Sequence, residues 1–175
     1  MNLQFYFEKL NDSDDFKKFF LENPEAYFCS GFFTIDFEGQ DNQRHIDYYV
    51  PTSKKIISFR LDSSSDASVV MQEARPDVEG DFPAPEKLND EIDFDFDEIQ
   101  KIIREETEKK EKGTKVNKML ISLQKRDGKE SLVCTVFVSR FGLLKINIDF
   151  KGKDGTPEIV FFKKKSLFDL VRKGD

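Results

Sequence analysis

Tryptophan is absent from this chain of 175 residues, histidine occurs once and cysteine twice. With His45 alone and no HxxxH pattern, cysteine pair or calcium-binding loop, the sequence contains no recognisable metal site. Its 9 glycines form neither a GxGxxG pattern nor a P-loop. A nucleophile–base pair would require His45 beside Cys29, Cys134 or a serine, with an acid to orient it. We therefore predict no catalytic residue, no metal ion and no cofactor, and a protein that is not an enzyme.

Long apolar runs are also missing, since none approaches the ~20 residues that cross a membrane. The first residues lack the basic region that opens a signal peptide. Cys29 and Cys134 lie far apart in apolar surroundings, which favours buried free thiols in a reducing compartment over a disulfide. We expect a cytoplasmic protein that does not enter a membrane.

A basic excess, the usual mark of nucleic-acid binding, is lacking as well. The chain has 28 Lys and Arg against 34 Asp and Glu, a net charge of −6. Residues 1–88 hold 9 basic and 17 acidic residues, a net of −8, whereas residues 89–175 hold 19 and 17, a net of +2. The lysine run at 163–165 is typical of a solvated strand edge. The charge distribution predicts no nucleic-acid partner.

Aromatic residues are abundant instead, with 19 Phe and 4 Tyr. Because each ring buries a large area, we expect a core built from rings. In the first half, Phe16, Phe19 and Phe20 recur at helical spacing after Ser13, a residue type that caps helices. Alternating, β-rich segments follow and predict three strands, at 26–37, 44–50 and 55–61.

The second half repeats this order. Ile99, Ile102 and Ile103 have helical spacing, and Gly113 is placed to end the helix. A tight turn is predicted at Asp127-Gly128. Four strands are predicted, at 116–125, 132–138, 144–150 and 158–162. The apolar faces of all these elements predict the following core residues: Phe16, Phe20, Ile99, Ile103, Ile121, Val136, Ile146 and Ile148.

Residues 62–90 separate the two halves with serines, acids and prolines, and only 69–71 favours a short edge element. We therefore predict an α+β fold with two helix-plus-antiparallel-sheet units in tandem. The first unit is 1–62, an acidic connection spans 63–90, and the second unit is 91–175. Whether the units share one sheet is left open by the sequence, and so is the oligomeric state.

Three stretches resemble PepSY-like proteins. Residues 46–59 are similar to the strand-turn-strand in which two tyrosines and a proline precede a lysine turn. Residues 88–99 resemble the entry into the next helix, and residues 145–155 resemble the closing strand and turn. The resemblance implies a cystatin-like fold, a helix wrapped by a curved antiparallel sheet. It also implies a mostly non-enzymatic role, in binding or inhibiting proteins or as an extracytoplasmic module.

The aromatic surplus between residues 26 and 59 suggests where binding takes place. Successive strand residues face opposite sides, so one ring each of Phe32-Phe33 and Tyr48-Tyr49 must point away from a single core. Such a ring either recognises a partner or is covered by the other unit or by a second subunit. The candidate binding residues are Phe32, Phe33, His45, Asp47, Tyr48 and Tyr49.

Two functions follow from these candidates. The first is a non-catalytic module that recognises a protein or peptide through an aromatic-rich sheet face. The alternative is a small-ligand binder or small enzyme whose pocket lies between helix and sheet near His45, Asp47 and Tyr49. A further acidic set, Asp93, Asp95 and Asp97, is predicted to face solvent rather than to bind a cation.

Overall fold

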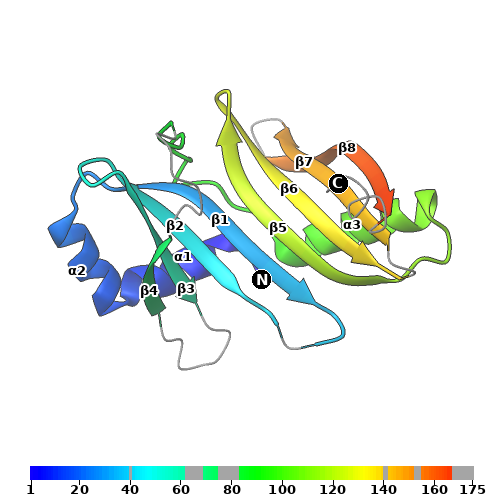
Figure 1. Cartoon of the computed structure of the whole chain (residues 1–175), viewed down its shortest axis with the longest axis horizontal. Coiled ribbons are helices and arrows are strands. Elements are labelled where there is room, and N and C mark those ends of the chain that lie inside the picture. Colours follow the sequence, from blue (N-terminus) through cyan, green and yellow to red (C-terminus); the bar gives the residue numbers. More distant parts are fainter. Residues whose placement is uncertain (40, 62–68, 75–82, 140–141, 152–154, 167–175) are drawn as a thin grey trace, which may run out of the picture.

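The computed structural model describes residues 1–39, 41–61, 69–74, 83–139, 142–151 and 155–166. Within this part of the chain, three helices accompany one antiparallel sheet of eight strands (Figure 1). The helices are α1 (Leu3–Asp12), α2 (Asp14–Glu22) and α3 (Phe96–Lys110). The strands are β1 (Tyr27–Asp36), β2 (Arg44–Val50), β3 (Lys55–Leu61), β4 (Val69–Ala74), β5 (Val116–Arg126), β6 (Lys129–Val138), β7 (Gly142–Lys151) and β8 (Thr156–Ser166). The predicted α+β class with an antiparallel sheet is confirmed.

The strands follow the order β4-β3-β2-β1-β5-β6-β7-β8. Two meanders, β1 to β4 and β5 to β8, meet where β1 pairs with β5, with Phe33 opposite Ile121. The first meander has a fourth strand, because the edge element expected at 69–71 extends through Ala74. The eight strands therefore form one continuous sheet. The sequence also favours a helical turn capped by Ser166, but residues 167–175, which would form it, lie outside the described residues.

The two predicted helices are present, and a third precedes them. Asp95 caps α3, since its side chain accepts hydrogen bonds from the backbone nitrogens of Asp97 and Glu98. Ser13 lies at the cap position of α2 but makes no side-chain cap bond. Helix α1 is not among the predicted helices; Asn2 caps it, and its apolar face is buried. That face consists of Leu3, Tyr6, Phe7 and Leu10.

All three helices pack on one face of the sheet. Three edge-to-face ring pairs join helices to strands: Phe7–Phe28 with centroids at 5.0 Å, Phe16–Phe59 at 5.1 Å and Phe96–Phe33 at 4.8 Å. Seven of the eight predicted core residues are buried, and Phe20 is partly buried against the same cluster. The opposite face of the sheet has no helix on it among the described residues (Figure 1).

A bulge in β1 sets which of its residues face the helices. The register with β2 shifts between Phe28, opposite Tyr48, and Ser30, opposite Asp47. Both Phe28 and Phe33 can therefore point to the helix face. Gly31 is needed here, because a Cβ at this position would lie 2.9 Å from the Phe33 ring.

Candidate functional site

A pocket of about 540 Å³ opens between α1, α2 and the start of β1. Six of its lining side chains are aromatic: Phe7, Phe16, Phe20, Tyr27, Phe28 and Tyr48. Five are polar or charged: Gln4, Asn11, Lys17, Lys87 and Asp90. Ala26 completes the wall. This volume and this apolar wall with a few polar groups are typical of ligand sites.

The rings of the pocket hold one another in place. Phe20 of α2 packs against Phe16 with centroids at 4.8 Å and against Tyr48 at 5.3 Å, both edge to face. Phe28 lies under Phe7 of α1. Since the short α2 contributes two of these rings, its packing on the sheet also builds one wall of the pocket.

Tyr48 contributes a polar atom to this apolar wall. Its side chain is buried, with 6% exposed, yet its hydroxyl makes no hydrogen bond to any described residue. Burial raises the pKa of Tyr48 above its usual value, and the nearby Asp90 carboxylate raises it further. The phenol therefore stays neutral, and its hydroxyl has both its donor and its acceptor available in the pocket.

Tyr27 lines the same pocket but differs in this respect. Its hydroxyl donates a hydrogen bond to the carbonyl oxygen of Pro85 at 2.8 Å. The chain thus carries two tyrosines at one pocket, of which only Tyr48 has an unpaired hydroxyl within the described structure.

The rim of the pocket carries charges of both signs. Lys87 and Asp90 form an ion pair at 3.5 Å, and Lys17 donates to the carbonyl oxygen of Asp12 at 3.0 Å. Gln4 donates to the carbonyl oxygens of Asp90 at 3.3 Å and Ile92 at 3.1 Å. Lys87 and Asp90 offset each other, so Lys17 is the one lining charge without an oppositely charged partner among the described lining residues.

The structure distributes the six predicted binding residues over both faces of the sheet. Phe33 is fully buried under α3, and Tyr48 faces the pocket. Four residues belong to the face without helices: Phe32, His45, Asp47 and Tyr49. His45, Asp47 and Tyr49 therefore do not line the pocket between helix and sheet. Tyr49 is itself only 9% exposed, and its ring lies 5.5 Å from that of Tyr27.

His45 is held by two neutral partners on this face. Its Nδ1 lies 3.2 Å from the Ser58 hydroxyl and its Nε2 lies 3.2 Å from the Gln43 side-chain oxygen. Burial lowers the pKa of His45, although Asp47 acts in the opposite sense. Ser58 is buried at 4% exposed, and no acid contacts the second ring nitrogen, so the pair lacks the geometry of a catalytic triad.

The two cysteines are free and buried, as predicted. Burial raises the pKa of Cys29 and of Cys134 to about 12. The Cys29 thiol donates to the carbonyl oxygen of Asp47 at 3.4 Å, and the Asp47 carboxylate accepts from Ser30 at 2.7 Å. Neither thiol is therefore an activated nucleophile.

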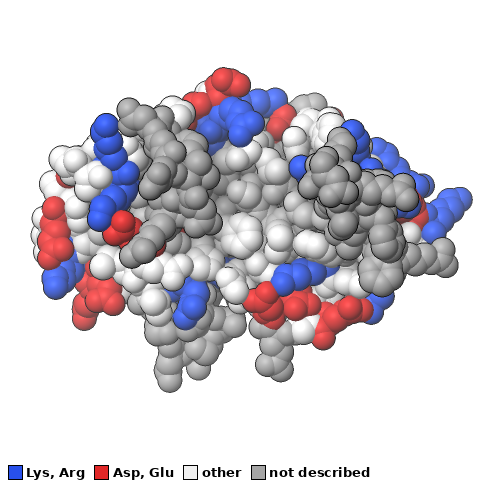
Figure 2. Space-filling view, in the orientation of Figure 1, with Lys and Arg blue, Asp and Glu red and all other residues white. Residues whose placement is uncertain are grey.

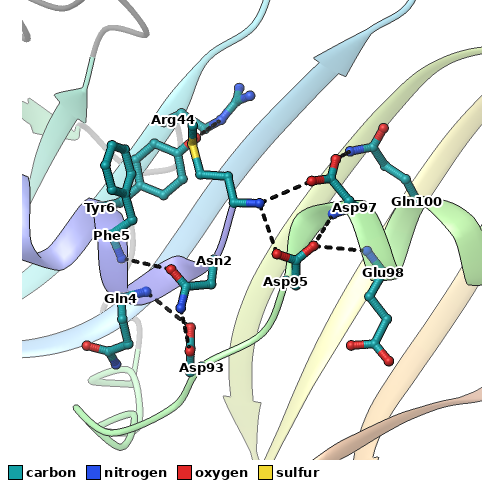
Figure 3. A network of polar contacts seen from close by, with 11 residues as sticks. Asn2, Gln4, Phe5, Tyr6, Arg44, Asp93, Asp95, Asp97, Glu98 and Gln100 are labelled. Carbon is teal, nitrogen blue, oxygen red and sulfur yellow. Dashed lines mark hydrogen bonds and ion pairs between the residues drawn. The ribbon is translucent and has the colours of Figure 1, made fainter.

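Asp93 and Asp95 before α3, together with Asp97 in its first turn, connect the start of α1 to the start of α3 (Figure 3). The amino group of Met1 lies 2.9 Å from Asp95 and 3.1 Å from Asp97. Asn2 donates to Asp93 at 2.9 Å. Hydrogen bonding to the Met1 ammonium lowers the pKa of Asp95. Within the described residues, no group of three or more His, Cys, Asp or Glu side chains is arranged to hold a metal ion.

The helix-free face has an uncharged centre. Figure 2 looks onto this face and shows white side chains across the middle, with blue and red side chains mostly around them. Phe32 is half-buried there, 6.3 Å from the His45 ring. This face is therefore a second surface that exposes uncharged side chains, Phe32 among them.

Comparison with known proteins finds no match: no family model, no curated protein and no solved structure matches the chain. The resemblance to PepSY-like proteins stays a prediction. None of the helices in the described ranges is long and apolar enough to cross a membrane.

Proposed function

We propose that this protein is a non-catalytic binding module that recognises a peptide segment by taking one of its side chains into the aromatic pocket. The observation that carries this proposal is the pocket of about 540 Å³ walled by six rings from α1, α2, β1 and β2. A buried aromatic or aliphatic anchor is the usual source of affinity in peptide recognition.

The rim favours a peptide over a free ion. Asn11 and Gln4 line the pocket with amide groups, and the ion pair of Lys87 with Asp90 leaves Lys17 as the single remaining charge of the described lining. A peptide backbone offers neutral donors and acceptors that match such a rim. The site is thus suited to an apolar side chain attached to amide groups.

The absence of tryptophan makes this proposal easy to test, because the fluorescence of an added indole can be excited selectively. N-acetyltryptophanamide should show saturable binding to the wild-type protein. Ala26→Leu fills the pocket and should abolish this binding, whereas Ala84→Leu makes the same change at an exposed site outside the pocket and should not. Equal binding to both variants, or none to the wild type, would contradict the proposal.

A second candidate is recognition of a protein through the helix-free face. Its uncharged centre and the half-buried Phe32 favour it (Figure 2). Under this alternative, a partner would contact Phe32, His45 and Tyr49 and leave the pocket unaffected. Mapping the residues that respond to a bound peptide therefore distinguishes the two sites.

We also propose that the chain consists of two tandem PepSY-like units that share the sheet. The order of strands is symmetric about the β1–β5 pair, and helices precede each meander. The two buried, free thiols are compatible with a reducing, cytoplasmic location, which we propose for the protein.

A further inference from the structure

The two tyrosines of the pocket differ in whether their hydroxyl groups are available to a ligand. The Tyr27 hydroxyl is satisfied by the Pro85 carbonyl oxygen at 2.8 Å. Tyr48 is only 6% exposed, and its hydroxyl has no hydrogen-bond partner among the described residues; this oxygen is not shut off from solvent, so it is accessible from the pocket. A ligand group that bonds to this hydroxyl replaces water there and gains the net free energy of about one hydrogen bond.

Asp90 defines the kind of group that fits beside Tyr48. Its carboxylate lines the same pocket and lies close enough to raise the pKa of the phenol. A ligand carboxylate at this place would be repelled by Asp90, and a ligand ammonium would compete with Lys87, which lies 3.5 Å from Asp90. A neutral group with an O–H or N–H donor avoids both penalties.

We infer that the side chain bound in the pocket ends in a neutral hydrogen-bond donor, such as a phenol or an indole, which Tyr48 and Asp90 recognise. The inference rests on the proposed function, because it names the ligand class of the same pocket. The rings of Phe7, Phe16 and Phe20 contact the apolar part of this side chain, and the Tyr48 hydroxyl hydrogen-bonds to its polar end.

The test compares N-acetyltyrosinamide with N-acetylphenylalaninamide, which differ only in the phenol hydroxyl. Each is titrated into the ¹⁵N-labelled protein and followed by amide chemical shifts. We expect the tyrosine compound to bind the wild-type protein about tenfold more tightly, the effect of roughly one satisfied hydrogen bond. Tyr48→Phe should remove this preference, and Tyr49→Phe, which makes the same change on the helix-free face outside the pocket, should retain it.

The folding of both variants is checked by the same amide spectra. Tyr48→Phe removes only an unpaired hydroxyl, so we expect the fold to be kept. Equal binding of the two compounds to the wild type would overturn this inference while leaving the proposed function intact. A preference that survives Tyr48→Phe would also overturn it. If neither compound binds, both the inference and the proposed function fail.

Discussion

At the scale of single residues, His45 should give the stability of the protein a clear dependence on pH. It is the only histidine of the chain, and burial lowers its pKa in the folded state. The unfolded chain therefore binds this proton more readily than the folded one, so stability is greatest above the unfolded pKa and is lost as pH falls below it. Between about pH 7.5 and pH 5.5, the free energy of unfolding should decrease.

His45→Gln isolates this effect, because glutamine keeps a polar side chain opposite Ser58 and does not titrate. Urea unfolding at several pH values should give a flatter pH dependence for the variant than for the wild type. Identical slopes would show that His45 is not the group responsible.

The cysteines provide a second prediction at this scale. A pKa of about 12 for both thiols leaves almost no thiolate at neutral pH. We expect a thiol-specific disulfide reagent to react slowly with the native protein and rapidly with two thiols after unfolding in denaturant. Rapid reaction of the native protein with either thiol would contradict the burial of that residue.

At the scale of elements, α3 is anchored on the sheet by a narrow apolar stripe. Ile103 is fully buried, whereas its neighbour Ile102 is partly exposed. Ile103→Ala should destabilise the protein by about 2–4 kcal/mol, the usual cost of truncating a buried isoleucine. Ile102→Ala is the matched control and should cost clearly less in the same urea unfolding measurement. A similar loss for the two variants would mean that the helix packs differently.

Elements with a strong apolar period could be predicted from the sequence, and those without one could not. The interiors of α2, α3 and most strands follow from the spacing of Phe and Ile residues. β4 carries Val70 and Met71 exposed at an edge of the sheet, so no core-facing alternation marks its length. α1 has a helical stripe, but its Phe and Tyr residues also favour strands.

The other edge strand, β8, combines several features that discourage pairing with further strands. Pro157 lacks a backbone donor, a register shift interrupts its pairing with β7, and lysines follow at 163–165. The lysine run that the sequence predicts to be a solvated strand edge therefore lies on an edge strand. The same features act against the tendency of the exposed Val160 and Phe161 to promote association at this edge.

At the scale of the whole molecule, one hydrophobic cluster contains residues of both halves, from Leu3 to Ile148. Because β1 pairs with β5 within this cluster, we expect both halves to unfold together. Scanning calorimetry should show one transition whose calorimetric and van't Hoff enthalpies agree. Two separate transitions would mean that the halves are independent domains.

Neither the pairing of the two halves nor the pocket could be predicted from the sequence, because both depend on contacts between distant residues. The β1–β5 pairing connects Phe33 with Ile121, and a contact across such a distance leaves no local period in the sequence. The pocket likewise combines side chains from three separate regions, including Phe7, Tyr48 and Asp90. Strand alternation did predict that one ring of Tyr48-Tyr49 leaves the core. Only packing shows that Tyr48 faces the pocket.

The most direct test of the central claim is an amide chemical-shift map of the ¹⁵N-labelled protein titrated with N-acetyltryptophanamide. We predict saturable shifts confined to α1, α2, the start of β1, the part of β2 around Tyr48 and residues 87–90, the segments that line the pocket. Shifts centred on Phe32 and His45 of the helix-free face, or no saturable shifts, would contradict the assignment of the pocket as the binding site.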